Sequence, residues 1–153
     1  MRAVVQRVSS SSVKVEGKIV GQIDRGLAVL LGVLEGDTRT EAELLAKKLC
    51  ELRIFTDSQG KMNQSVQDIG GGLLIVSQFT LAADCSHGRR PSFLRAANPL
   101  EASELYEYFI SCVRDMVEGP VQSGIFGAHM EYRIINDGPV TILLDTDEWR
   151  KKA

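Results

Sequence analysis

The stretch GGGLLIVSQFTLAADCSHGRRPSF, residues Gly70 to Phe93, holds the most informative pattern in the chain. Three glycines precede Leu73 to Val76, a short apolar run that contains two β-branched residues. A run of this kind, bounded by turn residues, predicts a strand that is buried on both faces. Polar residues follow at once, so we expect the strand to end at Ser77 and to lead into a turn-rich segment.

The end of this predicted strand gathers polar groups around one aromatic ring. Ser77, Gln78 and Thr80 supply two hydroxyls and an amide, and Phe79 lies among them. Buried hydroxyls and amides cost free energy unless they are hydrogen-bonded. Two interpretations follow: an ordinary strand end whose polar groups bond one another, or a site where a ligand completes their hydrogen bonds.

A second polar segment, Asn136-Asp137-Gly138-Pro139-Val140-Thr141, separates two strand-like runs, Met130 to Ile135 and Val140 to Asp145. Asp-Gly is a strong signal for a two-residue turn, and a proline can begin a strand where no N–H is required. Taken alone, the segment therefore predicts a β-hairpin.

Strand-like runs dominate the rest of the sequence. The N-terminal part predicts a strand over Arg2 to Val8, a bend or bulge over Ser9 to Ser12 and a hairpin turn at Glu16-Gly17. Leu27 to Val33 is the most apolar run and predicts a central strand. A further short strand is predicted around Ser65 to Gln67.

Two helices have clear start signals. Thr38 and Glu41 form a capping-box pattern ahead of apolar residues at helical spacing. Asn98 opens a second helix, and Gly119-Pro120 is expected to end it with Gly119 in the left-handed conformation. With about six to eight strands, these helices predict an α/β (α+β) fold. A mostly antiparallel or mixed β-sheet would close toward a barrel, with the two helices packed outside.

Composition and charge indicate one globular domain, residues 1–153. The chain is 44% hydrophobic and 25% charged, with 18 basic and 20 acidic side chains and a net charge of −2. This balance argues against sequence-independent binding to long nucleic acids. Local cations, such as Arg89-Arg90 or Arg150-Lys151-Lys152, would suffice to hold one RNA end.

Cysteines, histidines and motifs narrow the class of protein further. The three cysteines are scattered and odd in number, and neither histidine has a metal-ligand spacing, which predicts a reduced cytoplasmic setting and no metal site. The N-terminus shows no secretory pattern, and no run of 18 apolar residues predicts a membrane span. HExxH, Walker and GxSxG motifs are absent, and we expect no cofactor.

Together, SQFTL at residues 77–81 and NDGPVT at residues 136–141 resemble the paired motifs of the D-aminoacyl-tRNA deacylases, the D-tyrosyl-tRNA deacylase family. The resemblance runs from MRAVVQRV through GRRPSF and VQSGIFGAHM to NDGPVTILLD. It implies a hydrolase that cleaves the ester between a D-amino acid, or glycine, and the 3′-terminal ribose of tRNA, as proofreading of translation. It also implies a homodimer that binds the aminoacyl-tRNA acceptor end in a pocket at the subunit interface.

The resemblance implies a site built from both motifs. Its catalytic positions lie at the end of the central strand: Ser77, Gln78, Phe79 and Thr80. Its substrate-binding positions form a second set: Arg7, Met130, Asn136, Gly138 and Pro139. By this resemblance Arg7 would orient the Gly-Pro loop, and Met130 would line the pocket. A cis Gly138-Pro139 bond of one subunit would project into the pocket of the other and exclude L side chains.

The chemistry leaves two alternatives open. Thr80 has the residue type of a nucleophile, but an unassisted hydroxyl is almost fully protonated at neutral pH, and its motif holds no base. In the alternative, the 2′-hydroxyl of the terminal ribose helps to activate water, and backbone N–H groups of residues 78–80 stabilise the oxyanion. We favour this second mechanism.

The expected filter for handedness is a main-chain carbonyl at Gly138-Pro139. The cis form of an X-Pro bond costs only about 0.5–1 kcal/mol, so such a pair can hold a carbonyl in an unusual direction. A rigid clash should discriminate better than an apolar pocket, which separates related groups by only about 1–3 kcal/mol. Glycine has no side chain to exclude, so we expect activity on glycyl-tRNA.

Two other functions compete with this interpretation. A non-catalytic RNA-binding or assembly module would need a basic face with exposed aromatics. Only nine aromatic residues occur, and Phe55, Phe79, Phe109 and Trp149 are not clustered with arginines. A small-ester hydrolase that uses Thr80 or Cys85 lacks a neighbouring base.

Overall fold

The computed structural model describes residues 1–149. The strands in this range are β1 (Arg2–Val15), β2 (Lys18–Ile23), β3 (Gly26–Gly32), β4 (Phe55–Thr56), β5 (Met62–Gln64), β6 (Gly72–Ser77), β7 (Val121–Ser123) and β8 (Glu131–Asp145). The α-helices are α1 (Arg39–Glu51), α2 (Val66–Ile69) and α3 (Pro99–Met116), and two 3₁₀ helices are η1 (Phe79–Ala82) and η2 (Thr146–Trp149).

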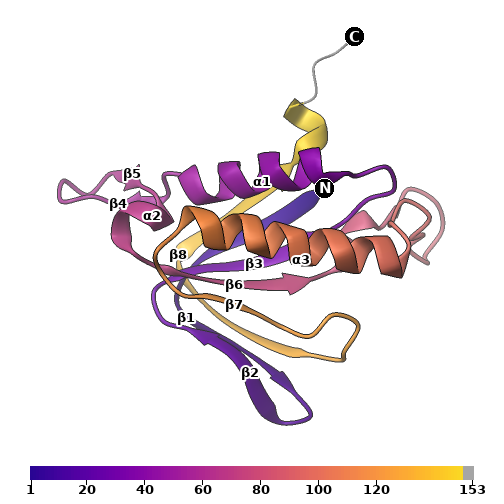
Figure 1. Cartoon of the computed structure of the whole chain (residues 1–153), viewed down its shortest axis with the longest axis horizontal. Coiled ribbons are helices and arrows are strands. Elements are labelled where there is room, and N and C mark those ends of the chain that lie inside the picture. Colours follow the sequence, from indigo (N-terminus) through magenta and orange to yellow (C-terminus); the bar gives the residue numbers. More distant parts are fainter. Residues whose placement is uncertain (150–153) are drawn as a thin grey trace.

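The main sheet is mixed, as predicted. Its order is β2-β1-β3-β6-β7, and β8 pairs with β1 as well (Figure 1). The pairs of β1 with β2, β3 and β8 are antiparallel, whereas β6 runs parallel to both β3 and β7. The strongly apolar segment β6 is therefore a central parallel strand, and its residues 72–76 are buried. This burial explains why it lacks the alternation of an exposed strand.

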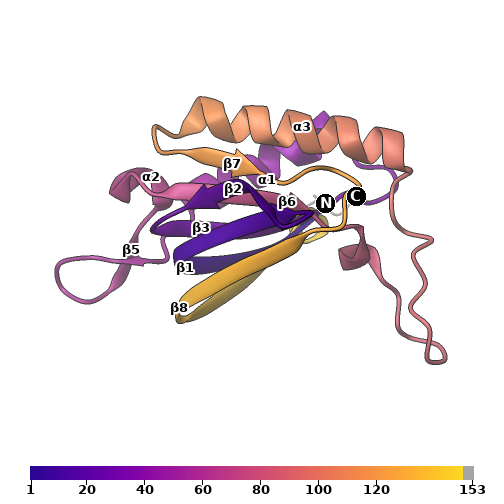
Figure 2. The same cartoon turned by 90° about the horizontal axis from the view of Figure 1, so that it is seen from below.

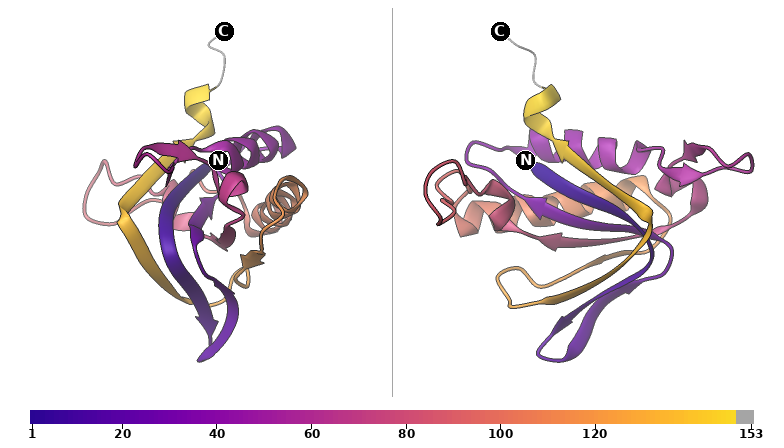
Figure 3. Two further views of the ribbon diagram at one scale, coloured as in Figure 1. Left: turned by 90° about the vertical axis from the view of Figure 1, so that its left-hand side faces the viewer. Right: turned by 180° about the vertical axis from the view of Figure 1, so that it is seen from behind.

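The sheet curls until it nearly closes into a barrel (Figure 3). The hydroxyl of Tyr132, on β8, accepts a hydrogen bond from the N–H of Val29 at 3.1 Å and donates one to the carbonyl of Leu74 at 2.6 Å. Gly21 on β2 approaches β7 so closely that a Cβ there would lie 2.7 Å from the carbonyl oxygen of Ser123. These contacts fold the outer halves of β1 and β8 across the inner strands.

Two apolar cores follow from this shape. The larger core lies between the sheet and helices α1 and α3, which lie along the same side of the sheet (Figure 2). Tyr106 of α3 is buried there and donates its hydroxyl to the carbonyl of Ile75 at 2.6 Å. The smaller core fills the inside of the curl, around Val13, Leu74 and Val76. The arrangement confirms the predicted fold class.

The helix start signals are confirmed, but one stop signal is not. Thr38 and Glu41 form the capping box of α1, and Asn98 caps α3 through the N–H of Glu101. However, α3 ends at Met116, and Gly119 does not adopt a positive φ. Gly119 is required for a different reason, because a Cβ at this position would overlap the carbonyl oxygen of Gly71.

A third helix replaces the strand predicted around Ser65 to Gln67. Ser65 caps the single turn of α2, and Asp68 completes a capping box with it. Gly70 then ends the turn in the left-handed conformation, with φ of 62°. The prediction was wrong because a one-turn helix has too few residues to show helical periodicity, although the Ser-x-x-Asp cap and the glycine are local signals for it.

Two segments that were predicted to interrupt or reverse the chain lie within long strands. Ser9 to Ser12 do not bend the chain out of β1, since Ser10 to Ser12 pair with β8 and Ser11 and Ser12 also pair with β2. The register with β8 shifts between Val8 and Ser10, which agrees with the bulge that was the other predicted form. The hydroxyl of buried Ser11 donates to the carbonyl of Arg133 at 2.6 Å. The NDGPVT segment forms no hairpin either, since both halves of β8 run antiparallel to β1. Its Gly138-Pro139 bond is cis, and the pairing register shifts beside it.

Candidate active site at the end of strand β6

Strand β6 ends where the first motif begins, and the chain turns there into η1. The N–H of Gln78 donates to the carbonyl of Leu31 at 2.8 Å, which fixes the turn to the end of β3. Ser77 and Gln78 are half-buried, whereas Phe79 and Thr80 are exposed. The first motif is therefore a rigid turn whose second half faces solvent.

The hydroxyl of Thr80 accepts a hydrogen bond from the side-chain amide of Gln78. Within residues 1–149, the Thr80 side chain has a hydrogen bond to the Gln78 amide alone. An amide does not act as a base. The turn therefore satisfies its own hydroxyl in part, as in the first interpretation of this strand end. It offers Thr80 no group that would remove its proton.

The main chain of the same turn presents free donors. The first N–H groups of a helix have no carbonyl partner within it. The N–H groups of Phe79 and Thr80 occupy these positions in η1, while that of Leu81 bonds the carbonyl of Gln78 at 3.2 Å. Because the Gln78 N–H is already engaged with Leu31, only those of Phe79 and Thr80 remain to stabilise an oxyanion.

A cavity of about 620 Å³ opens beside this turn. Ser77, Gln78 and Phe79 line it together with His129 and Met130. Its volume lies within the range of about 300–1,000 Å³ that is typical of small-ligand sites. The structure thus brings Met130 together with the first motif, although the two are far apart in the sequence.

Tyr132 forms part of the cavity wall and is held rigidly. Burial raises the pKa of its phenol, although hydrogen bonds to the main chain of Val29 and the side chain of Ser11 act in the opposite direction. The hydroxyl therefore stays protonated at neutral pH and serves as a structural donor to Leu74. It cannot supply the base that the site lacks.

Sequence reasoning did not identify His129 as a residue of this cavity. It is exposed at the rim, next to Met130, and it precedes β8. Pro99 and Ala102 of α3 also line the cavity, because α3 begins close to the end of β6. The only signal in the sequence for His129 as a cavity residue was its position next to Met130. That signal could be used only after Met130 had been assigned to the cavity.

The second motif forms a bulge that is held by Arg7 and Asn136. The guanidinium of Arg7 donates to the carbonyls of Asp137 at 2.9 Å and of Ile54 at 2.8 Å. The Asn136 amide accepts the N–H of Val140 at 2.8 Å and donates to the hydroxyl of Thr141 at 3.0 Å. These bonds hold the Gly138-Pro139 loop in place, and the Asn136 amide is engaged within the loop itself.

The two motifs lie at opposite ends of the sheet (Figure 1). Arg7 pairs with Leu27 near the start of β3, whereas Gln78 bonds Leu31 at its end. Four residues of strand separate these positions by about 13 Å. Arg7, Asn136, Gly138 and Pro139 therefore do not reach the cavity of their own chain, and neither motif completes the predicted site alone.

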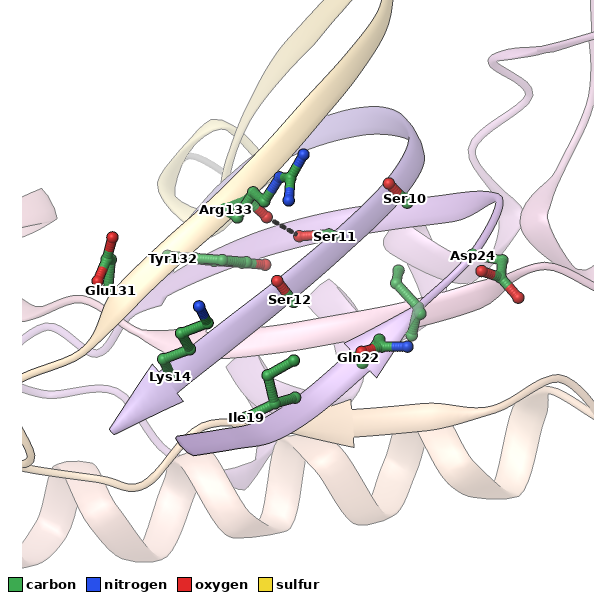
Figure 4. A pocket seen from close by; sticks show the side chains of 11 residues that line it. Ser10, Ser11, Ser12, Lys14, Ile19, Gln22, Asp24, Glu131, Tyr132 and Arg133 are labelled. Carbon is green, nitrogen blue, oxygen red and sulfur yellow. Dashed lines mark hydrogen bonds between the residues drawn. The ribbon is translucent and has the colours of Figure 1, made fainter. Parts of the chain in front are cut away.

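A second cleft, of about 590 Å³, lies between β1, β2 and the first half of β8 (Figure 4). Serine hydroxyls and the charged side chains of Lys14, Glu131 and Arg133 line it. Ser11 bonds the main chain of Arg133 there. Neither motif contributes a residue to this cleft, so we place the candidate site at the cavity beside η1.

Two kinds of feature are absent from residues 1–149. No helix in this range is both long enough and apolar enough to cross a membrane. In the same range, no group of three or more His, Cys, Asp and Glu side chains is arranged to hold a metal ion.

Comparison with known proteins identifies the family. A protein of Thermosipho melanesiensis named D-aminoacyl-tRNA deacylase is 56% identical over 146 residues, which cover 95% of this chain and 97% of that protein. One of Geotalea uraniireducens with the same name is 55% identical over 153 residues, covering 100% of this chain and 98% of the other.

Solved structures share the fold. One titled c-Myc DNA Unwinding Element Binding Protein matches with a TM-score of 0.91 and 41% identity, over 95% of this chain and 98% of that chain. A probable eukaryotic D-amino acid tRNA deacylase matches with a TM-score of 0.79 and 22% identity, over 94% and 97% of the two chains. The family model described as D-Tyr-tRNA(Tyr) deacylase matches residues 4–145. The chain therefore belongs to the D-Tyr-tRNA(Tyr) deacylase family.

Proposed function

We propose that this protein hydrolyses the ester bond between a D-amino acid and the 3′-terminal ribose of tRNA, in the cytoplasm. The observation that carries the proposal is the η1 turn, which lies beside the cavity. This turn contains part of the SQFTL motif, and the family model matches residues 4–145. The turn offers two main-chain N–H groups at one place, from Phe79 and Thr80. Such preorganised donors stabilise the oxyanion that forms when water attacks an ester.

The arrangement of the turn favours a mechanism without a side-chain nucleophile. The Thr80 hydroxyl is bonded to an amide rather than to a base, so nothing in the turn would convert it into an alkoxide. The substrate itself carries a hydroxyl next to the ester, on the terminal ribose. In the proposed mechanism this 2′-hydroxyl helps to activate water, while the protein holds the ester against the N–H groups of Phe79 and Thr80.

The proposed enzyme acts as a homodimer in which each subunit completes the cavity of the other. The support is the separation of the motifs: Arg7, which holds the Gly138-Pro139 loop, pairs with Leu27, about 13 Å along β3 from Leu31, which bonds Gln78. A two-fold assembly allows one chain to contribute the turn and its partner to contribute the loop. The loop carbonyl would then exclude L side chains from the cavity, while a D side chain or glycine would pass.

The direct test is deacylation of one tRNA charged with a D-amino acid, with its L enantiomer or with glycine. We expect the D ester and the glycyl ester to be hydrolysed well above the uncatalysed rate, and the L ester to stay at that rate, because a rigid carbonyl rejects by collision. Release of labelled amino acid measures all three. Equal hydrolysis of the D and L esters would contradict the proposed filter. The absence of hydrolysis of all three esters would contradict the proposed function.

Substitution of Thr80 separates the two mechanisms. Thr80→Ala should lower the single-turnover rate by no more than about 10²-fold, because its main-chain N–H persists and its hydroxyl is not the nucleophile. Rapid-quench measurement of the D ester gives this rate, and circular dichroism checks the fold of the variant. A loss of about 10⁴-fold or more exceeds what one oxyanion donor supplies and would identify Thr80 as the nucleophile.

A second candidate is nucleic-acid binding without catalysis. The observation that favours it is the name of the 41% identical solved structure, c-Myc DNA Unwinding Element Binding Protein. The overall charge of −2 speaks against it, since sequence-independent affinity comes from neutralising many phosphates. An active wild-type protein in the deacylation assay would exclude a purely non-catalytic role.

A further inference from the structure

The segment that follows η1 leaves the body of the molecule as a narrow hairpin, residues 84–92. The N–H of Asp84 donates to the carbonyl of Ser92 at 2.8 Å, and the N–H of Ser92 donates back to the carbonyl of Asp84 at 2.9 Å. Figure 2 shows this segment extending away from the sheet beyond η1. Residues 84–91 are all exposed, so the hairpin presents its tip to solvent next to the candidate site.

Positive charge is concentrated in this part of an acidic protein. Residues 79–97 contain three arginines, Arg89, Arg90 and Arg95, and one acidic residue, Asp84, which gives a net charge of +2. The rest of the chain has 15 basic and 19 acidic side chains and a net charge of −4. A polyanion would therefore be attracted to residues 79–97, which include the hairpin, more strongly than to the rest of the protein taken together.

Two of these arginines are not used to hold the fold. Within residues 1–149, no hydrogen bond, ion pair or ring contact engages the guanidinium of Arg89 or Arg90. In contrast, Arg2 binds Asp145 and Arg7 binds the carbonyl of Asp137. The planar guanidinium matches the oxygens of a phosphate group, so a free adjacent pair on a closed hairpin suits two successive phosphates.

Exposed rings lie at the foot of the hairpin. Phe79 and Phe93 pack edge to face, with their ring centroids 5.1 Å apart, yet Phe79 remains 58% exposed and Phe93 36% exposed. Phe79 also lines the cavity. Aromatic faces beside cations are the features by which proteins hold single-stranded nucleic acid, because bases stack on the rings and cations bind the backbone.

We propose that the 84–92 hairpin holds the single-stranded 3′ end of tRNA, with Arg89 and Arg90 on its phosphates and a base against the Phe79 and Phe93 rings. This inference rests on the proposed function, because the hairpin would lead the esterified ribose toward the cavity beside η1. Contacts to phosphates carry no information about sequence. The hairpin would therefore serve every tRNA alike, while discrimination of the amino acid stays inside the cavity.

The test is a double variant, Arg89→Gln with Arg90→Gln, in steady-state deacylation of D-aminoacyl-tRNA at two salt concentrations. We expect KM to rise at least about 10-fold at 50 mM salt with kcat unchanged, and the slope of log KM against log salt to fall by about 1.4, which corresponds to two single-strand phosphate contacts. The conservative pair Arg89→Lys with Arg90→Lys should keep most of the affinity and slope. Filter binding of uncharged tRNA should weaken by the same factor as KM, without any catalytic step.

The matched control removes two adjacent cations elsewhere. Lys47→Gln with Lys48→Gln changes the net charge equally at exposed positions toward the end of α1. The ammonium of Lys48 also lies 5.4 Å from the centroid of the Trp149 ring, so circular dichroism is used to check the fold of this control. KM and the salt slope should stay at wild-type values in this control. If both double variants changed KM and the salt slope equally, the effect would come from the overall charge of the protein, and the hairpin inference would be wrong.

Three outcomes separate the hairpin from the function. An active wild type with unchanged KM, slope and tRNA affinity in the arginine variant would overturn the hairpin inference alone. A change of oligomeric state on gel filtration would show that the arginines bind a second copy rather than RNA. If the wild type hydrolyses no ester, the proposed function fails, and binding of uncharged tRNA still decides whether the hairpin holds RNA.

Discussion

Gly26→Ala should strongly destabilise the folded state, because the new methyl group would overlap the backbone of the neighbouring strand. A Cβ at Gly26 would overlap the carbonyl oxygen of Gly72 and lie 2.7 Å from its carbonyl carbon and its nitrogen. These two glycines form the first pair of β3 with β6. Neither backbone can move away without losing the parallel pairing that carries the η1 turn.

We expect this substitution to cost at least about 3 kcal/mol, the upper part of the range for overpacked sites. Small domains have only about 5–15 kcal/mol of stability. The variant should therefore be largely insoluble or unfold at a much lower urea concentration than the wild type. Gly60→Ala is the matched control, since a Cβ there meets no atom within 4 Å and only its φ of 80° is unfavourable. It should cost about 1–2 kcal/mol. Equal urea midpoints for the two variants would show that β3 and β6 tolerate separation.

Gly138→Ala should reduce deacylation without unfolding the protein. A Cβ at Gly138 would lie 2.7 Å from the nitrogen of Val140 and 2.8 Å from its side chain, at a φ of 149° that L residues rarely adopt. The loop would have to shift, and with it the carbonyl that is proposed to enter the partner's cavity. A displacement of about 1 Å at a reacting site can cost about 10²-fold, so we expect a loss of this size in kcat/KM on the D ester.

The fold should survive this change because β8 pairs with β1 on both sides of the bulge. Gly60→Ala again serves as control, with wild-type kcat/KM expected. Comparison of kcat/KM and urea midpoint for both variants separates a shifted loop from general destabilisation. Wild-type activity in a folded Gly138→Ala protein would mean that the loop plays no part in the reaction.

The parts of the fold that sequence reasoning predicted correctly are those with local causes. Side chains of Thr38 and Asn98 cap their helices through bonds within three residues, so the pattern alone reveals them. The apolar run of β6 is buried on both faces wherever the strand lies in a covered sheet. Such features do not depend on which strands become neighbours.

The errors arose where distant partners decide the structure. A bend or bulge was predicted at Ser9 to Ser12, yet pairing with β8, and with β2 at Ser11 and Ser12, excludes the bend and leaves only a shift of register beside Ser9. Asp-Gly read as a hairpin turn, yet Arg7 and Asn136 hold it as a bulge within one strand. A local turn propensity of this kind yields to long-range pairing, which the sequence of one segment does not contain.

The candidate site shows the same division. The polar cluster of Ser77 to Thr80 was predictable, because it follows directly on a buried strand. The cavity was not, since it requires Met130 and the start of α3 to meet the end of β6 in space. The distance between the two motifs was also hidden, because it depends on the register of β1 with β3 and β8.

Because of the course of strand β8, two different inactive mutants of the proposed dimer should complement each other. Met130, just before the strand, lines the cavity of its own chain, while Gly138 lies at the far end of the sheet. A subunit damaged at the η1 turn would still lend a sound loop, and a subunit damaged at the loop would still offer a sound turn. A dimer of one chain with a damaged turn and one chain with a damaged loop would therefore contain one intact active site. Its other active site would carry both defects.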